Sequence, residues 1–419
     1  MKEIYLTMLK TLFLENKKSS SLIKGNLEFY QNDFQDFPKS LFPGEWIQVT
    51  DSLNNTNYLA YVNPYAVKTP PVRIVESIQA KLEQDLNEED LAKKIILKNL
   101  NYAKKKRDIF NNYRNGMRLV HGSSDNLPGL TVDIYKESIL VQINTAGMDR
   151  FRAEIKDFLK KTYTNQKVFF LDMEKVRERE GLPKFEEEKP EKLIIEENGL
   201  CYKIKGEILQ KIGFYYDHRE NRKKLERKIG ELNINLKQGL DLFSYVGSWG
   251  LHMLRSKVSM VTFVDQGNFE NEVNENLNDN GFSGRGNFLR QDVFKFLDES
   301  IEKGSNFDIV VSDPPAFSKE TKNIQNALLG YEKLHRKIMK VLSPTSLFVA
   351  ASCTHGISFE EFANTVNLAA IKENRKIQII DIGIQGGDHP FSSFESREFY
   401  LKYILYLVSE RNSGEHHEY

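Results

Sequence analysis

The order of the elements predicted after residue 195 limits the fold more than any other feature of the sequence. Apolar runs alternate there with helical stretches, which is typical of a parallel sheet with helices wound on both faces. The runs that we expect to form core strands are Leu240–Phe243, Met260–Asp265, Phe307–Ser312 and Ser346–Ser352. Two further strands, Lys376–Ile382 and Phe399–Val408, are separated by a loop and not by a helix. A sheet that ends in such a hairpin differs from nucleotide-binding dehydrogenase folds, which continue with βα units.

The rest of the chain predicts two smaller domains, because 419 residues exceed what one hydrophobic core accommodates. Residues 1–78 contain short β elements such as Trp46–Val49 and Tyr58–Val62, separated by turn residues, which is the pattern of a small barrel or sandwich. A helical stretch from about residue 77 to 112 and a β-rich segment from Met117 follow, up to a linker rich in Gly, Pro and Glu. We therefore predict a β-barrel domain at 1–78, a central α+β domain with its linker at 79–192, and an α/β domain at 193–419.

The composition excludes several classes of protein. Basic and acidic residues number 59 each, so the formal net charge is +0 and any nucleic-acid site has to be a local patch. The two cysteines, Cys201 and Cys353, do not make a disulfide framework, and no Cys/His cluster has zinc-ligand spacing. The segment Ile4–Leu14 reads as a strand or a buried segment and not as a signal peptide, and no run reaches the ~18 to 20 apolar residues that cross a bilayer. We expect a cytoplasmic protein without metal or membrane; homodimerisation stays open.

One basic run stands out, at the end of the predicted central helix. It comprises Lys104, Lys105, Lys106 and Arg107. Such a run can contact the phosphates of a nucleic acid, or it can simply be a solvated helix face. The sequence leaves both interpretations open.

A cofactor site is indicated by acidic residues that end three successive strands. The segment Asp241–Gly250 lies between the first strand and a helix, and its glycines allow a tight turn close to a ligand, with Phe243, Tyr245 and Gly247 as candidate contacts. It lacks the dinucleotide fingerprint, because Tyr245 stands where a glycine is needed. Asp265 ends the second strand, where an acid accepts from both ribose hydroxyls, and Asp292 follows the third, where it can accept from an adenine amino group. Although a structural strand–helix turn would explain the first segment alone, the set predicts an adenosyl cofactor.

The segment Asp313–Phe317 directly follows the fourth strand. Its prolines, Pro314 and Pro315, stop the strand and leave rigid carbonyls and a carboxylate facing the same crevice. Asp313 can accept hydrogen bonds from an exocyclic amine of a planar base, and Pro314, Pro315 and Phe317 are candidate substrate contacts. A surface turn is the alternative, but a plain turn does not require two prolines after a buried apolar strand.

Cys353 ends the next strand and should open into the same crevice. A buried structural cysteine is the usual alternative. A thiolate has a clear use beside Asp313, because carbon 5 of cytosine is a poor nucleophile until a thiolate adds at carbon 6. Cys201 lies before a different run and is expected to serve packing.

Taken together, these residues resemble the bacterial 23S rRNA cytosine-5 methyltransferases that carry an N-terminal PUA domain. The resemblance rests on the segments Arg118–Leu130, Gln210–Arg219, Asp241–Gly250, Asp313–Phe317, Ser352–Cys353 and Asp388–Pro390. It implies a class I (Rossmann-like) methyltransferase domain, an N-terminal PUA-like barrel, a central α+β domain, S-adenosylmethionine as cofactor and ribosomal RNA as partner. It further implies that Cys353 is the nucleophile, and that Gln210–Arg219, with Tyr216 and Arg219, closes over the cofactor.

Two other functions remain as alternatives. A related branch methylates guanine at nitrogen 7; it shares the Asp313–Ser318 motif but lacks the cysteine, so Cys353 favours cytosine. The second alternative is that the chain is an RNA-binding or assembly protein that keeps the fold without turnover. The intact set Asp241, Asp265, Asp292, Asp313 and Cys353 argues against that last alternative.

Overall fold

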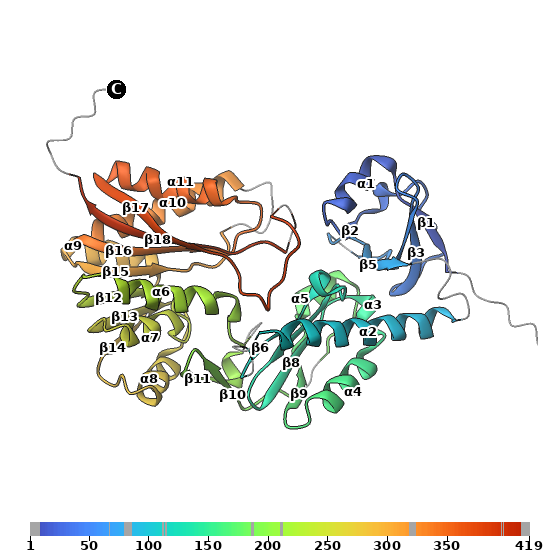
Figure 1. Ribbon diagram of the computed structural model, residues 1–419, viewed down its shortest axis with the longest axis horizontal. Coiled ribbons are helices and arrows are strands. Elements are labelled where there is room, and N and C mark those ends of the chain that lie inside the picture. The colour runs from blue at the N-terminus through green and yellow to red at the C-terminus, as the bar shows by residue number, and fades with distance from the viewer. Residues whose placement is uncertain are drawn as a thin grey trace, which may run out of the picture. The chain divides into compact units, whose positions relative to one another are not determined.

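The structure is a computed structural model that describes residues 9–66, 68–78, 86–110, 113, 115–185, 188–209, 213–317, 324–394, 396 and 398–411. Parts of five predicted segments lie outside these ranges: residues 4–8, residues 79–85 and 111–112 of the helical stretch, residues 186–187 of the linker, residues 210–212, and residue 318. The chain divides into two compact units (Figure 1). Unit 1 comprises Met1–Ile195, Lys205–Phe214 and Gly387–Phe399, and unit 2 comprises Glu196–Ile204, Tyr215–Gly386 and Tyr400–Tyr419.

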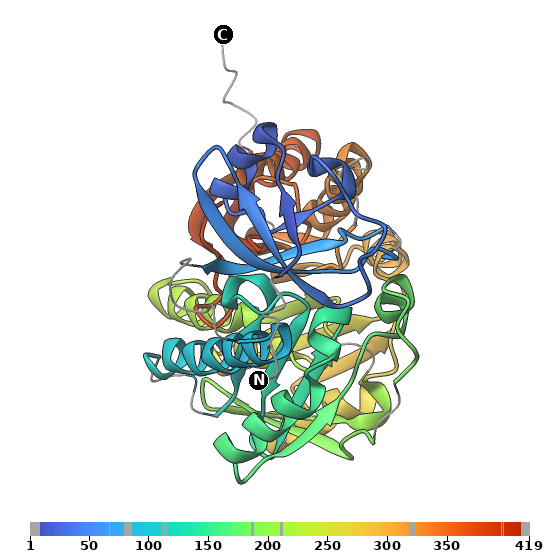
Figure 2. The same cartoon turned by 90° about the vertical axis from the view of Figure 1, so that its right-hand side faces the viewer.

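Unit 1 begins with a five-stranded sheet in the order β1-β3-β4-β5-β2. Its elements are β1 (Thr11–Phe13), α1 (Asn16–Ile23), β2 (Glu28–Phe29), β3 (Glu45–Asp51), β4 (Thr56–Val62) and β5 (Val72–Ile78). β1 pairs with β3 in parallel and the other neighbours are antiparallel, and Figure 2 shows the strands crossing as the sheet curls. Apolar side chains such as Leu12, Ile47 and Val62 form its core. The two predicted runs, Trp46–Val49 and Tyr58–Val62, are confirmed as parts of β3 and β4.

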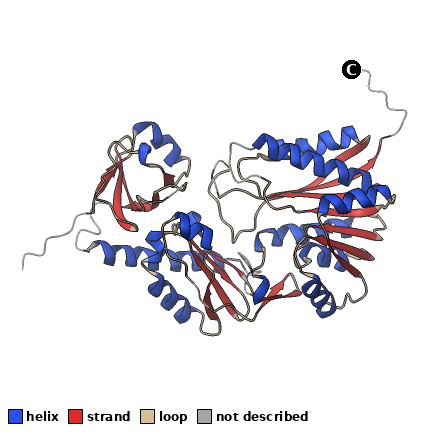
Figure 3. Cartoon of the chain, turned by 180° about the vertical axis from the view of Figure 1, so that it is seen from behind, coloured by secondary structure: helices blue, strands red, loops and turns tan. Residues whose placement is uncertain are grey.

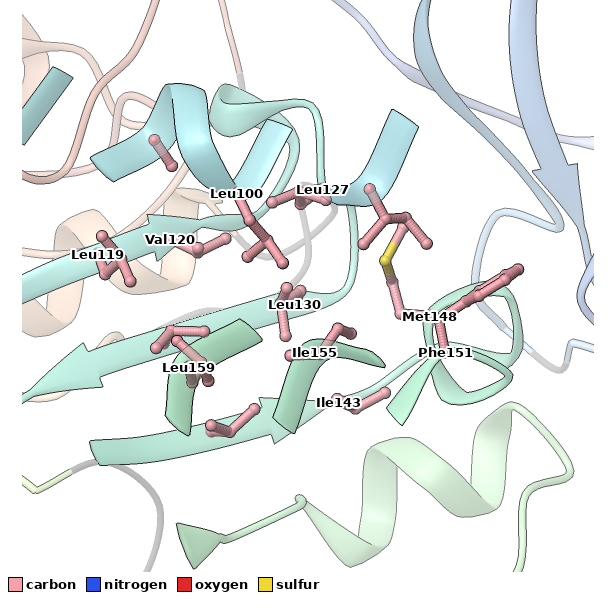
Figure 4. Packing of buried hydrophobic residues seen from close by; sticks show 14 of the residues in the cluster. Leu100, Leu119, Val120, Leu127, Leu130, Ile143, Met148, Phe151, Ile155 and Leu159 are labelled. Atoms are coloured by element: carbon pink, nitrogen blue, oxygen red, sulfur yellow. The ribbon is translucent and has the colours of Figure 1, made fainter. Parts of the chain in front are cut away.

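The second sheet of unit 1 has four strands in the order β6-β7-β8-β9, with β8 and β9 parallel. The elements are α2 (Glu88–Asp108), β6 (Met117–His121), β7 (Leu130–Ile134), β8 (Ser138–Ile143), α3 (Ala146–Asp149), α4 (Arg152–Thr162), β9 (Lys167–Phe170) and α5 (Glu174–Arg179). Leu100 of α2 and Ile155 and Leu159 of α4 pack against strand residues such as Leu130 (Figure 4). The predicted helix starts too early in the sequence, since residues 72–78 pair with β4 as a strand and the helix begins at Glu88 behind the N-cap Asn87.

Two strands, β10 (Lys192–Glu197) and β11 (Leu200–Lys205), form a small sheet before the helix α6 (Arg219–Glu231). Unit 2 then follows the predicted alternation. Its elements are β12 (Gln238–Leu242), α7 (Ser248–Arg255), β13 (Met260–Asp265), α8 (Glu270–Asp279), β14 (Gly286–Arg290), α9 (Val293–Glu302), β15 (Phe307–Ser312), α10 (Ile324–Val341), β16 (Leu342–Ser352), α11 (Phe359–Lys372), β17 (Arg375–Gly383) and β18 (Lys402–Glu410).

The seven strands of unit 2 lie in the order β14-β13-β12-β15-β16-β18-β17. The first five are mutually parallel, and β18 runs antiparallel to both β16 and β17, which confirms the predicted α/β sheet with its terminal hairpin. Helices cover both faces (Figure 3): α9, α10 and α11 share one apolar core with the sheet, and α6 packs beside α7. The described helices include none long and apolar enough to cross a membrane.

Candidate active site

The carboxyl ends of the parallel strands bring the predicted residues of unit 2 to one edge of the sheet. β13, β12, β15 and β16 are consecutive neighbours, and they end beside Asp265, Asp241, Asp313 and Cys353, respectively. In a doubly wound sheet this edge, around the point where the strand order reverses, is where ligands bind. β12 is that point, because β13 lies on one side of it and β15 on the other.

The loop after β12 is tightly folded around Asp241. The backbone N–H of Gly250 donates to Oδ2 of Asp241 at 2.8 Å, whereas Oδ1 is buried without a hydrogen-bond partner in the described part of the chain. Burial raises the pKa of Asp241 well above its usual value. A Cβ atom at Gly250 would lie 2.0 Å from the Phe263 ring, so this approach of helix to strand requires glycine. The buried Oδ1 can therefore accept a hydrogen bond from a ligand donor.

Three residues of this loop adopt the left-handed backbone conformation. The φ angles are +60° at Phe243, +48° at Tyr245 and +84° at Gly247. Such conformations cost free energy in residues other than glycine and cluster at functional sites. Asp265 holds the loop in place, because its Oδ2 accepts from the Tyr245 N–H at 2.9 Å and its Oδ1 from the Gly267 N–H at 2.8 Å. The turn after β12 therefore contains three predicted cofactor residues, Phe243, Tyr245 and Gly247. The fourth, Asp265 at the end of β13, is hydrogen-bonded to that turn.

Asp292 has a different setting from the other acids. It is exposed and caps α9, with its side chain accepting from the Lys295 N–H at 3.0 Å and from the Gln266 amide. A capping role alone explains an Asp at this position, so the contact with an adenine amino group stays a prediction.

Asp313 is held by two side chains that the sequence motifs do not single out. The indole N–H of Trp249 donates to Oδ2 at 3.0 Å, and Nε2 of His218 lies 3.5 Å from Oδ1. Burial alone would raise the pKa of Asp313, but His218 and the bond from Trp249 outweigh it, so that the pKa lies below its usual value. The group is thus kept as a carboxylate, an acceptor for amine donors.

Cys353 and the Asp313–Phe317 turn meet directly. The Cys353 thiol donates to the Pro314 carbonyl oxygen at 3.9 Å. Burial, followed by the negative charges of Asp313 and Asp217, raises the pKa of Cys353 to about 12. The ring centroids of Tyr331 and Phe317 lie 4.5 Å apart, and the Tyr331 hydroxyl bonds with Ser352 Oγ at 2.9 Å and Thr354 Oγ1 at 2.7 Å. Tyr331 therefore ties the two strand ends together.

The segment that precedes α6 is anchored by a buried ion pair. Arg222 donates to both carboxylate oxygens of Glu197, at 2.6 and 2.7 Å, and to the Tyr215 carbonyl at 2.8 Å. The predicted cofactor residues Tyr216 and Arg219 are both buried, with the Arg219 guanidinium 4.4 Å from the centre of the Tyr216 ring. Closure of this segment over a cofactor stays a prediction.

Sequence reasoning missed several residues of this site, notably Asp217, Trp249, Tyr331 and Lys402. Trp249 lies in the first turn of α7 and within the predicted segment Asp241–Gly250, where a large aromatic residue before Gly250 was a usable signal. Lys402 was also visible, as the one charged residue among the apolar residues Leu401–Val408. Asp217 lies within the predicted segment Gln210–Arg219, but nothing in that segment marked it as a neighbour of Cys353. Tyr331 gave no signal, because only tertiary packing brings it to the strand end that precedes Cys353.

The basic run divides into exposed and buried residues, all in unit 1. Lys105 and Lys106 are exposed, but Lys106 Nζ lies 3.5 Å from Asp125 Oδ1, and Lys104 is paired with Asp108 at 2.6 Å. Arg107 is 1% exposed and donates to both oxygens of Asp125 and to the Asp388 carbonyl, so it supports the fold and does not face solvent. The prediction that Arg107 contacts phosphates is therefore wrong. No group of His, Cys, Asp and Glu suited to a metal ion occurs among the described residues.

Residues 167–367 match the family described as S-adenosylmethionine-dependent methyltransferase. Ribosomal RNA large subunit methyltransferase I of Aeromonas salmonicida is 31% identical over 337 residues, which cover 78% of this chain and 84% of the relative. A relative of the same name from Aliivibrio fischeri is 31% identical over 325 residues, covering 75% of this chain and 80% of the relative.

Solved structures share the fold. A chain from Streptococcus mutans described as a SAM-dependent methyltransferase superposes with a TM-score of 0.74 at 18% identity, covering 95% of this chain and 100% of that chain. A methyltransferase complexed with SAH superposes with a TM-score of 0.75 over the same shares, also at 18% identity. At this identity the likeness concerns the fold alone.

Proposed function

This chain belongs to the family of S-adenosylmethionine-dependent methyltransferases that includes ribosomal RNA large subunit methyltransferase I, and we propose that it forms 5-methylcytosine in large-subunit ribosomal RNA. The observation that carries the proposal is the contact between the Cys353 thiol and the carbonyl of Pro314, next to Asp313. It joins a nucleophile to a turn suited to a planar base with an exocyclic amine. An rRNA substrate implies a cytoplasmic site of action.

The residues at the strand ends fit S-adenosylmethionine, which when bound supplies an electrophilic methyl group on a sulfonium. The buried Oδ1 of Asp241 lacks a donor, and the left-handed turn beside it brings backbone close to any ligand. We propose that the residues holding the cofactor are Asp241, Phe243, Tyr245, Gly247, Asp265, Asp292, Asp313, Tyr216 and Arg219. Among them, Asp265 would accept from the ribose hydroxyls.

In the proposed reaction the Cys353 thiolate adds to carbon 6 of the cytosine, forming an S–C6 bond and making carbon 5 nucleophilic. Carbon 5 then takes the methyl group, while the electron pair of the broken S–CH3 bond stays on the sulfonium sulfur. A base removes the carbon 5 proton, the C5–C6 double bond re-forms, and the S–C6 bond breaks to return the thiolate. Asp313 would hold the cytosine by accepting from its amino group, against Pro314, Pro315 and Phe317.

Asp217 is our candidate for the base that removes the carbon 5 proton. Its side chain is 8% exposed, and its Oδ1 is buried without a hydrogen-bond partner among the described residues. Its negative charge is one of those that raise the pKa of Cys353, so it lies within electrostatic reach of the thiol. A carboxylate with a free oxygen near the nucleophile can take a proton from the bound base.

Binding of the RNA would extend to unit 1. We propose that the curled five-stranded sheet within residues 1–78 is a PUA-like RNA-binding domain and that residues 79–192 form a separate central domain. Lys104, Lys105 and Lys106 would contact phosphates, since Lys105 and Lys106 are exposed and Lys104 is half-exposed near the end of α2.

Replacement of the nucleophile tests the function. Cys353→Ala should keep the fold and the cofactor affinity but lose methyl transfer to rRNA, whereas Cys201→Ala, on β11, should keep activity. RNA with 5-fluorocytosine at the target should trap the wild-type enzyme covalently, because fluorine cannot leave as a cation. Substantial activity of Cys353→Ala without a trapped adduct would replace the cytosine reaction by direct transfer to guanine nitrogen 7, which needs no covalent step.

A further inference from the structure

A lysine is buried in unit 2 directly beside the strand that carries Cys353. Lys402 is the first residue of β18, and it lies opposite Ser352 in the antiparallel pairing with β16. Its exposed fraction is 1%, and every other residue from Leu401 to Val408 is apolar. Burying an ammonium group costs free energy that an apolar side chain of the same length would not cost. Its presence therefore calls for a specific role.

The ammonium group holds the chain that follows Cys353. Nζ donates to the carbonyl oxygens of Thr354 and Ile357, both at 2.8 Å. These carbonyls belong to the first and the fourth residues after the cysteine, so one side chain fixes the whole turn that leaves β16. The positive charge thereby lies against the carbonyl of Thr354, the residue that follows Cys353. The group is buried, and charge interactions in such a region are stronger than in solution.

From this geometry we propose that Lys402 is a positioning residue for the nucleophile, because its buried ammonium fixes the turn Cys353–Ile357 and stabilises the thiolate form of Cys353. The inference rests on the proposed role of Cys353 as nucleophile. It extends the site to β18, a strand that contributes no residue to the reaction proposed above.

The charged and titratable groups around the thiol explain why such a charge is needed. Asp313 from the turn after β15 and Asp217 before α6 are negative and oppose a thiolate, and Tyr215 and Tyr331 also face Cys353. His355 stands in the same turn, beside Tyr400. Burial lowers the pKa of Lys402 to about 8, while Cys353 and Glu361 act to raise it. Below pH 8 the ammonium therefore stays charged, and it counteracts the destabilising effect of the two carboxylates on the Cys353 thiolate.

Thiol alkylation measures this effect without RNA or methyl transfer. The rate at which iodoacetamide modifies Cys353 in the full chain, followed by mass spectrometry of the peptides, reports its thiolate fraction, and Cys201 is an internal reference. Lys402→Gln keeps an N–H donor but loses the charge, Lys402→Arg keeps the charge, and Lys376→Met on the neighbouring strand β17 is the matched control. At pH 7 we expect Lys402→Gln to slow alkylation of Cys353 about tenfold, as expected for the loss of a nearby opposite charge. Lys402→Arg and Lys376→Met should stay near the wild type.

The pH profile separates charge from packing. The difference between the wild type and Lys402→Gln should narrow above pH 8, as Lys402 of the wild type loses its proton. An unchanged rate in a folded Lys402→Gln, or a loss of equal size at every pH, would overturn the proposal. If Lys402→Gln does not fold, the pH dependence of Cys353 alkylation in the wild type tests the proposal. Coupling to Lys402 predicts that this curve departs from the titration of a single group near pH 8, and a curve that fits a single group contradicts the proposal. Because alkylation requires no turnover, its outcome is independent of the Cys353→Ala methylation test.

Discussion

The hydroxyl of Tyr400 donates a hydrogen bond of 2.8 Å to Oδ2 of Asp217 in unit 2. The two residues are far apart in the sequence, before α6 and before β18, respectively. The bond uses one carboxylate oxygen and orients the group, while Oδ1 stays without a partner among the described residues. An oriented, half-satisfied carboxylate near Cys353 is suited to accept a proton.

Replacing Asp217 should therefore stop the reaction after the methyl group has been transferred. In Asp217→Asn the carbon 5 proton is no longer removed, and the cysteine cannot leave. We expect a covalent protein–RNA adduct to accumulate with unmodified RNA, visible by denaturing electrophoresis. Tyr400→Phe keeps the carboxylate and should turn over with at most a modest loss. Turnover of Asp217→Asn at the wild-type rate would remove Asp217 from this role.

Asp265 should contribute to cofactor affinity. Asp265→Ala removes a charged acceptor and also the partner of the Tyr245 and Gly267 N–H groups, so we expect S-adenosylmethionine binding to weaken by roughly 1.5 to 3 kcal/mol. Calorimetry measures the affinity, and Asp298→Ala, an exposed acid on α9, is the control. Unchanged affinity in a folded Asp265→Ala protein would exclude the residue from the cofactor site.

The lysines at the end of α2 should affect the salt dependence of RNA binding. Replacing Lys104, Lys105 and Lys106 by Gln should lower the slope of log affinity against log salt by about 0.7 to 0.9 for each lost phosphate contact. Lys93, Lys94 and Lys98 on the same helix form a matched control set. A slope equal to that of the wild type would identify the run as a solvated helix face.

The parallel strands of unit 2 could be predicted because strands covered on both faces appear as continuous apolar runs. The convergence of Asp241, Asp265 and Cys353 then follows from strand direction, since parallel strands end at one edge. Burial of Arg107 could not be read from the basic run, where four residues look alike. In the helix, Arg107 lies four residues after the buried Ala103 and therefore on the same buried face. Lys104, Lys105 and Lys106 lie on other faces of the helix.

The role of Lys402 was out of reach for a related reason. It depends on the antiparallel pairing of β18 with β16, which places Lys402 opposite Ser352 although fifty residues separate them in the sequence. The hairpin itself was predicted, but its register was not, and register decides which side chains meet. The end of β5 shows the same limit, because residues 77 and 78, where the helix was predicted to begin, pair with β4 as a strand.

The ion pair between Glu197 and Arg222 should make unit 2 sensitive to acid. Burial acts to raise the pKa of Glu197, but Arg222, His252 and Arg219 outweigh it and lower the pKa from 4.5 to about 2. A carboxyl group with a depressed folded-state pKa adds stability that is fully present above pH 4.5 and is lost as the pH falls toward 2. The size of this contribution is on the order of 3 kcal/mol.

Denaturation in urea at several pH values, followed by a signal from unit 2 such as the fluorescence of Trp249, tests this contribution. Glu197→Gln should be destabilised by about 3 to 5 kcal/mol at pH 7, because it leaves the buried Arg222 without its carboxylate. The gap between the wild type and Glu197→Gln should narrow as the pH falls from 4.5, since protonation removes the same charge from the wild type. Glu231→Gln, which affects an exposed pair with Lys228, should have little effect at either pH. A gap that stays constant down to pH 3 would show that Glu197 stabilises the segment through packing and not through its charge.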